Sequence, residues 1–242
     1  MNYLFLKMKI KQFTFSHFME NCYVLTDIGT QQCAIVDPGM SMPFEQEQLF
    51  QYIDQQHYTP VLLLLTHAHV DHIAGLRTTA EYYHLPVSMH REGFHLLKEA
   101  PMYAQVMGFD TVLNMDNLPT RFLEDGEILT LGVTEQNKET TQDERTPQGK
   151  GIQIEARYVP GHCPGSLCFV VPSEDIVLTG DALFRGSIGR TDMPGGDYNL
   201  LVSKLRTRIL TLPDSYEILP GHGDISTIGE EHLHNPFLSP DV

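Results

Sequence analysis

The chain has 242 residues, of which 41% are hydrophobic and 19% are charged, a composition typical of globular proteins and not of disordered or fibrous ones. Its 16 basic and 31 acidic residues give a formal net charge of −15, which opposes binding to nucleic acid or to anionic membrane surfaces. No stretch approaches the roughly 18 apolar residues that span a bilayer, and Met1 to Phe15 lacks a secretory pattern. We therefore expect a cytoplasmic protein with neither a nucleic-acid nor a membrane partner.

The first half of the chain alternates between strand and helix patterns. Leu6, Met8 and Ile10 alternate with lysines, which predicts a half-buried strand. Pro43 suits the first turn of a helix that runs to about Gln56. The other expected elements are strands over 22–26, 33–36, 61–65 and 86–89 and helices over 73–84 and 91–108, with Asp27-Ile28-Gly29 as a turn and Asp37-Pro38-Gly39 at the end of the second of these strands.

The second half repeats this outline. Strand patterning surrounds the turn Glu124-Asp125-Gly126, and Ile152 to Tyr158 alternates cleanly. Thr134 to Gly151 contains no large apolar residue, which indicates a surface loop or an extended hairpin tip. A hairpin over 168–171 and 176–179, a helix over 197–212, a strand over 216–219 and a last helix after the capping-box sequence at 227–230 complete the chain.

Two sets of strands, each followed by helices, predict an α+β protein in which two sheets pack together with helices outside. We find neither a sequence repeat nor a domain boundary, and we expect residues 1–242 to form a single domain. The cysteines Cys22, Cys33, Cys163 and Cys168 match neither a zinc pattern nor a disulfide framework, so reduced and mostly buried thiols are expected.

A cluster of metal-binding residue types directly follows the buried strand 61–65. His67, His69, Asp71 and His72 lie within six residues, and imidazole and carboxylate groups are ligands that suit zinc, iron and similar ions. His67 and His69 can face the same way on an extended segment, while a turn would direct Asp71 and His72 to a second point nearby. A surface loop rich in histidine is the alternative, but four such residues directly after a buried strand favour a metal site.

Three further loops each place one such residue beside glycine just after a predicted strand. These residues are His162 in Pro160 to Gly165, Asp181 after Thr179-Gly180, and His222 in Leu219 to Gly223. Glycine lets the backbone turn sharply and come close to a ligand. Each loop alone is a weak signal, but together they supply the ligands that two metal ions need.

The motif HxHxDH at 67–72, with His162, Asp181 and His222 downstream, resembles that of the metallo-β-lactamase superfamily over nearly the whole chain. This resemblance implies a four-layer αβ/βα sandwich with the metal site at one edge between the sheets. It also implies that His67, His69 and His162 hold one ion, that Asp71, His72 and His222 hold the other, and that Asp181 bridges them. Two divalent ions are expected, with zinc first and iron or manganese as alternatives.

Within the superfamily, Asp181 to Asp192 resembles the glyoxalase II branch, in the short form that lacks a C-terminal helical domain, and the persulfide dioxygenases share a similar stretch. The resemblance implies that Arg190 contacts a glutathione conjugate. Arg185 and Tyr198 are further candidates for substrate contact. The alternative for either arginine is an ion pair with an acid such as Asp192 or Asp197 that braces the loop; we favour bracing for Arg185 and substrate binding for Arg190.

These observations lead to a metal-dependent hydrolase that acts on a small acyl thioester, as glyoxalase II does. A metal-bridging hydroxide would attack the carbonyl, and Asp71, besides serving as a ligand, could orient that hydroxide. A thiolate leaving group with a pKa near 8.5 needs little help from a general acid. The alternatives are a mononuclear iron persulfide dioxygenase with His67, His162 and Asp181 as ligands, a lactone hydrolase, and a non-catalytic metal-binding protein.

Overall fold

The strands of the first half form one mixed sheet in the computed structural model, which describes residues 8–109, 113–132 and 151–238. Neighbours from the first to the third strand are antiparallel, and those from the third to the sixth are parallel. The order is β1 (Met8–Phe15), β2 (Glu20–Asp27), β3 (Gln32–Val36), β4 (Thr59–Leu64), β5 (Val87–His90) and β6 (Thr120–Leu123).

The second half forms another six-stranded mixed sheet, in which only β13 and β10 are parallel neighbours. Its order is β14 (Ser226–Thr227), β13 (Glu217–Pro220), β10 (Ile176–Gly180), β9 (Leu167–Val171), β8 (Ile152–Tyr158) and β7 (Ile128–Leu131). The short hairpin β11 (Leu183–Phe184) and β12 (Ser187–Ile188) follows β10.

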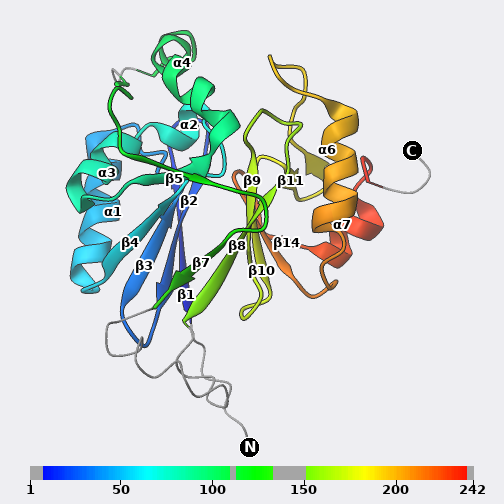
Figure 1. The fold of residues 1–242 in the computed structure, drawn as a ribbon, viewed down its shortest axis with the longest axis horizontal. Coiled ribbons are helices and arrows are strands. Elements are labelled where there is room, and N and C mark those ends of the chain that lie inside the picture. The colour runs from blue at the N-terminus through cyan, green and yellow to red at the C-terminus, as the bar shows by residue number, and fades with distance from the viewer. Residues whose placement is uncertain (1–7, 110–112, 133–150, 239–242) are drawn as a thin grey trace, which may run out of the picture.

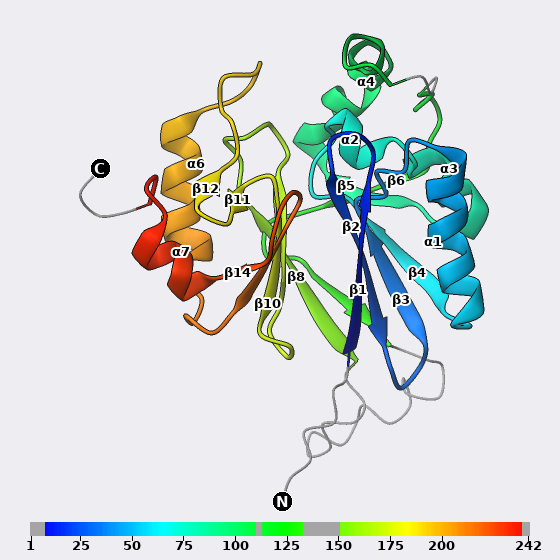
Figure 2. The same cartoon turned by 180° about the vertical axis from the view of Figure 1, so that it is seen from behind.

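Helices cover the outer face of each sheet, so the molecule has four layers (Figures 1 and 2). On the first sheet lie α1 (Pro43–Gln55) and α3 (Leu76–Tyr83), and on the second lie α6 (Tyr198–Lys204), which continues as the π-helical turn η4 (Leu205–Ile209), and α7 (Ile228–His234). At one end of the sandwich stand α2 (Val70–Ile73) and α4 (Phe94–Val106), the latter preceded by the 3-10 turn η1 (Arg91–Gly93). The expected αβ/βα sandwich is confirmed.

Strand alternation explains why both faces of each sheet are buried. On β3, Ile35 packs under the helices while Ala34 and Val36 face the other sheet. On β9, Phe169 faces the first sheet while Cys168 packs under α6 and α7. Because successive side chains of a strand point to opposite faces, one apolar run supplies two of the three hydrophobic cores. All four cysteines are buried, as predicted.

One expected helix differs from the structure. The helix predicted over 73–84 is broken at Gly75, whose N–H donates to the Pro38 carbonyl at 2.9 Å instead of extending the helix. A side chain at Gly75 would also meet the Met40 methyl group at 2.8 Å. The segment around Glu124 to Gly126 carries the chain from the first sheet to the second, because β6 pairs with β5 whereas β7 pairs with β8.

Residues 1–7 and 133–150 lie outside the described part of the chain, so the start of the first predicted strand and all of the predicted loop except Gly151 do too. Among the described residues, no helix combines the length and the apolar character that crossing a bilayer requires.

Candidate metal centre

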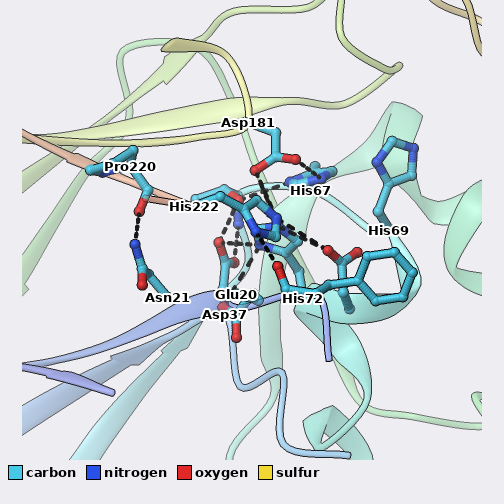
Figure 3. A network of polar contacts seen from close by, with 12 residues as sticks. Glu20, Asn21, Asp37, His67, His69, His72, Asp181, Pro220 and His222 are labelled. Atoms are coloured by element: carbon cyan, nitrogen blue, oxygen red, sulfur yellow. Dashed lines mark hydrogen bonds and ion pairs between the residues drawn. The ribbon is translucent and has the colours of Figure 1, made fainter. Parts of the chain in front are cut away.

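The carboxyl ends of four strands meet at one edge of the sandwich, where the seven residues named from the sequence gather. His67, His69, Asp71 and His72 follow β4. The loops after β8, β10 and β13 bring His162, Asp181 and His222 to the same place. Since β8, β10 and β13 run in one direction in the second sheet, their ends share an edge, and the polar side chains that follow them converge there; Figure 3 shows Asp181 and His222 beside His67 and His72.

Three histidines form a first group on one side of Asp181. The Nδ1 atom of His69 lies 2.9 Å from Nε2 of His162. The Oδ2 atom of Asp181 lies 3.7 Å from Nε2 of His162 and 4.0 Å from Nε2 of His67. These atoms surround a common point, as the ligands of one ion would, and Cys163 offers a fourth atom close to the three imidazoles.

A second group lies on the other side of the same carboxylate. The Oδ1 atom of Asp181 is 3.2 Å from Nε2 of His72 and 3.6 Å from Nε2 of His222. Asp71 completes the group, with its Oδ2 3.2 Å from Nε2 of His222. One oxygen of Asp181 therefore faces each group, which is the arrangement a bridging carboxylate requires.

Asp37 and Thr66 fix the orientation of two of these imidazoles. The Oδ2 atom of Asp37 lies 3.0 Å from Nδ1 of His72 and accepts the Thr66 hydroxyl at 2.5 Å. Because that hydroxyl donates to Asp37, it accepts from Nδ1 of His67, 3.0 Å away. Both rings then carry a proton on Nδ1, and Nε2 points into the centre. A hydrogen bond to the outer nitrogen sets the tautomer of a metal-binding histidine in this way.

Backbone carbonyls do the same for two more histidines. Nδ1 of His162 lies 2.8 Å from the Arg190 carbonyl oxygen, and Nδ1 of His222 lies 3.0 Å from that of Phe18. A carbonyl can only accept, so both rings are protonated on Nδ1 and turn Nε2 toward the cluster. The described structure thus directs the Nε2 atoms of four imidazoles toward the centre, with Nδ1 of His69 as a fifth nitrogen.

Charge and burial oppose each other in this cluster. Burial lowers the pKa of His67 well below its ordinary value, and burial together with His162 lowers the pKa of His69 to about 4. Burial also lowers the pKa of His72, but Asp181 and Asp71 outweigh it and hold that pKa well above its ordinary value. His67 and His69 therefore offer neutral imidazoles, and the second group lies in a strongly negative field that stabilises a cation.

Two observations test whether the donors fit metal ions. Nε2 of His67 and Oδ1 of Asp181 are buried, yet neither has a hydrogen-bond partner among the described residues. Buried polar atoms are rarely left without partners, and both atoms face the places where ions would lie. Neutral nitrogens with carboxylate oxygens are also a donor set for zinc, iron or manganese. The residues fit two divalent ions.

Close packing behind the cluster explains one of the glycines in the ligand loops. A Cβ atom on Gly221 would lie 2.4 Å from Oδ1 of Asp181 and 2.7 Å from Cε1 of His72. The Gly221 N–H donates to the Gly180 carbonyl at 2.9 Å, which ties the loop carrying His222 to the one carrying Asp181. Only glycine lets these two loops approach so closely.

Sequence reasoning missed Asp37 and Glu20, which stand behind His72. The sequence pattern assigns Asp37 only to the end of a strand, although an aspartate directly after a buried strand is a usable signal. The Glu20 carboxylate is fully buried, lies 3.9 Å from Nδ1 of His72 and has no hydrogen-bond partner in the described part of the chain. Burial raises its pKa well above the ordinary value. No sequence pattern marks it.

The three candidate substrate contacts lie in different surroundings. Arg190 lines the cavity above the cluster, but its guanidinium also donates to both carboxylate oxygens of Asp192, at 2.8 and 2.9 Å. Arg185 lies 3.5 Å from Asp224 and not against the expected acids, and it does not line the cavity. Tyr198 lines a separate depression along α6 that includes Phe237.

A cavity of about 370 Å³ opens directly onto the cluster, with His69, Asp71, His162, Asp181 and His222 in its floor. This volume is at the low end of the range for small-molecule sites. Its walls are formed by Phe18, Ala68, Val70, Leu96, Ala100, Tyr103, Met107, Phe184, Arg190, Met193 and Pro194.

Comparison with known proteins places this arrangement in a family. The sequence model described as the metallo-beta-lactamase superfamily matches residues 16–222. The hydroxyacylglutathione hydrolase GloC of Haemophilus influenzae is 36% identical over 236 residues, which cover 96% of this chain and 99% of that protein.

Two solved structures extend the comparison. The BLEG-1 B3 metallo-beta-lactamase has a TM-score of 0.80 and 31% identity, and the match covers 96% of this chain and all of that one. TTHA1623 in a di-iron-bound form has a TM-score of 0.76 and 32% identity, covering 94% of this chain and all of that one.

Proposed function

The chain belongs to the metallo-β-lactamase superfamily, and from this membership we propose that it hydrolyses a small acyl thioester with two divalent metal ions. The Asp181 carboxylate carries the proposal, because its two oxygens face two separate groups of imidazoles. The similarity to a protein named hydroxyacylglutathione hydrolase, over nearly the full length of both chains, supports a glutathione conjugate as the first substrate to test.

We assign one ion to His67, His69 and His162 and the other to Asp71, His72 and His222, with Asp181 shared. Zinc is our first choice; iron and manganese suit the same donors, and the related TTHA1623 is described as di-iron-bound. Such ions lower the pKa of a bound water to about 7 and polarise a carbonyl oxygen.

The protein's own groups would orient the reactants. Asp71 lies in the cavity floor, with its Oδ2 3.2 Å from His222, where it can accept a hydrogen bond from the attacking oxygen. Asp37, Thr66 and the Arg190 and Phe18 carbonyls keep the proposed ligands in place. Among the described cavity residues outside the cluster, Tyr103 and Arg190 are the only titratable side chains. The cavity therefore has few groups that could act as a general acid. A thioester suits such a site, because its thiolate leaving group, with a pKa near 8.5, leaves without protonation.

Hydrolysis of S-D-lactoylglutathione by metal-loaded protein tests the proposal. We expect turnover that requires metal and falls at least 100-fold in His69→Ala, because removing a ligand disturbs the site that activates water. The control is His232→Ala, an exposed histidine on α7 that should leave the rate unchanged. If the metal-loaded protein cleaves no acyl thioester of any kind, the proposal is wrong.

Oxygen consumption distinguishes this proposal from a persulfide dioxygenase. Iron content alone does not decide between them, because a related structure holds two irons. We expect the protein to cleave the thioester. In a separate assay with glutathione persulfide as substrate, we expect no oxygen uptake. Stoichiometric oxygen uptake with persulfide, and one iron per chain, would instead support the dioxygenase.

Two further outcomes would support the remaining alternatives. Turnover of lactones but not thioesters would support a lactonase, and a protein that binds metal but turns over no substrate would support a non-catalytic role.

A further inference from the structure

One face of α4 forms an apolar wall of the cavity, which we call the α4 wall. It consists of Leu96, Ala100, Tyr103 and Met107. The spacings of four, three and four residues place these side chains on one side of a helix. Leu97 and Ala104 fill the core on the adjoining side of the same helix, and Ala100 belongs to both sides. The helix is therefore apolar on the side that faces the protein interior and also on the side that lines the cavity.

The α4 wall lacks groups that could bind a charged or strongly polar substrate part. Its one polar side-chain group is the Tyr103 hydroxyl, and Phe18 extends the wall from the β1–β2 turn. Phe18 stacks at 5.6 Å on Phe109, which follows α4. A polar group pressed against such a surface loses its hydration without a replacement, whereas a hydrocarbon chain gains from leaving water.

The opposite wall comes from the second half of the chain and has a different character. It contains Phe184, Arg190, Met193 and Pro194. Arg190 is the only lysine or arginine among the described cavity residues, and its exposed guanidinium is held by Asp192. This side can accept a polar thiol carrier near solvent. The cavity thus has one apolar and one mixed wall, with the cluster between them.

We propose that the α4 wall binds the acyl group of the substrate and selects apolar acyl chains over short hydroxyacyl groups, while the thiol carrier leaves the cavity past Arg190. This inference rests on the proposed thioester hydrolysis and specifies its substrate class. A lactoyl group would place its hydroxyl against hydrocarbon, whereas a chain of four to six carbons would be covered by Leu96, Tyr103 and Met107.

The test uses thioesters of one small neutral thiol, N-acetylcysteamine, with acetyl, butanoyl, hexanoyl and D-lactoyl groups. For the metal-loaded wild type, kcat/KM should rise about fourfold for each methylene group that becomes buried, and lactoyl should fall below butanoyl. The corresponding free carboxylates should inhibit in the same order, which reports binding without turnover. Equal rates for acetyl, lactoyl and hexanoyl thioesters would overturn the inference but leave thioester hydrolysis intact, whereas no turnover at all would overturn both.

Two variants locate the chain-length preference. Leu96→Ala should flatten the rise in kcat/KM between acetyl and hexanoyl, and Met107→Trp, at the end of α4, should shorten the longest chain accepted. Val106→Ala is the matched control, because Val106 is 83% exposed on the same helix and does not line the cavity. All three should keep the wild-type metal content and circular dichroism. An unchanged preference in both wall variants would show that α4 does not bind the acyl group.

Discussion

The Asp37 carboxylate orients a proposed ligand without belonging to either proposed ligand set. Its Oδ2 accepts from Nδ1 of His72 and from the Thr66 hydroxyl, and its Oδ1 accepts from the Thr66 N–H. In Asp37→Asn an amide nitrogen replaces one of these acceptors, so the His72 ring loses its orientation.

We expect Asp37→Asn to weaken metal binding by about 10- to 100-fold, the range found for groups that hold metal ligands. Competition with a chromophoric chelator measures the dissociation constants. The control is Asp54→Asn, an exposed position on α1. Equal affinities in wild type and Asp37→Asn would contradict the orienting role.

The four cysteine thiols should be unreactive in the native protein. Cys22, Cys33, Cys163 and Cys168 have no measurable exposure. Burial raises the pKa of Cys33, Cys163 and Cys168 to about 12 and that of Cys22 well above its ordinary value, so at pH 8 the reactive thiolate is scarce. Ellman's reagent should label four thiols in denaturant and none rapidly without it. Rapid native labelling of one thiol would contradict this.

At the scale of elements, Glu45 connects the first turn of α1 to the β1–β2 turn. Its buried carboxylate accepts from the backbone N–H groups of Ser16, Ser41 and Met42, at 2.8, 2.7 and 3.0 Å. Removing the acceptor leaves several donors unpaired. We expect Glu45→Ala to lower the free energy of unfolding by about 3 kcal/mol, as measured by urea denaturation.

Two variants accompany Glu45→Ala. Glu45→Gln keeps acceptor oxygen and should recover part of the loss. Glu47→Ala, an exposed neighbour on α1, should change the free energy of unfolding by less than about 0.5 kcal/mol. A similar loss in Glu45→Ala and Glu47→Ala would mean that the removal of a negative charge near the start of α1, and not these hydrogen bonds, accounts for the effect.

The positions of the strands were easier to predict than the pairing between them. Local sequence patterns located β2, β3, β8 and β9 within about two residues, because a half-buried strand alternates and a strand buried on both faces is a short apolar run. It could not show that β6 and β7 belong to different sheets, since pairing depends on contacts with β5 and β8. The break at Gly75 was hidden for the same reason, as it depends on Pro38.

In the candidate site, too, features with a local sequence pattern were predictable and features that depend on tertiary contacts were not. The seven converging residues could be named because each follows a strand beside a recognisable motif. Asp37, Glu20 and the α4 wall escaped, because their roles arise only when the fold places them against His72 or above the cluster. The Arg190 ion pair was foreseen as an alternative to substrate contact, and the structure shows that Arg190 both pairs with Asp192 and lines the cavity.

At the scale of the whole molecule, we propose that the two sheets unfold together as one domain. A shared core containing Leu25, Leu64 and Phe169 lies between them. Asn21 in the first sheet donates to the carbonyls of Gly221, Pro220 and Gly223 beside the second. Calorimetry should give one transition whose van't Hoff and calorimetric enthalpies agree. Two separate transitions would contradict the single domain.

Metal removal should destabilise this whole unit. Each proposed ion has ligands from both halves of the chain, so it binds the native state far better than the unfolded one. Each ion at 100 times its dissociation constant would add about 2.7 kcal/mol, and a chelator should lower the Tm reversibly. Asp181→Ala, which lacks the shared carboxylate, should respond much less. A wild-type Tm that changes neither with chelator nor with added zinc would contradict the metal assignment.

The spread of the seven residues along the chain also sets an order of events during biosynthesis. His67 to His72 leave the ribosome long before His222, and at about 5–20 residues per second that delay lasts roughly 8 to 30 seconds. Until then the second proposed site lacks one of its imidazoles, and Asn21 and the Phe18 carbonyl lack their partners around residue 222. A nascent chain would then expose the proposed ligands His67 to His72 before the second proposed site could be completed, so we expect that site to bind metal only after the segment around residue 222 has been made.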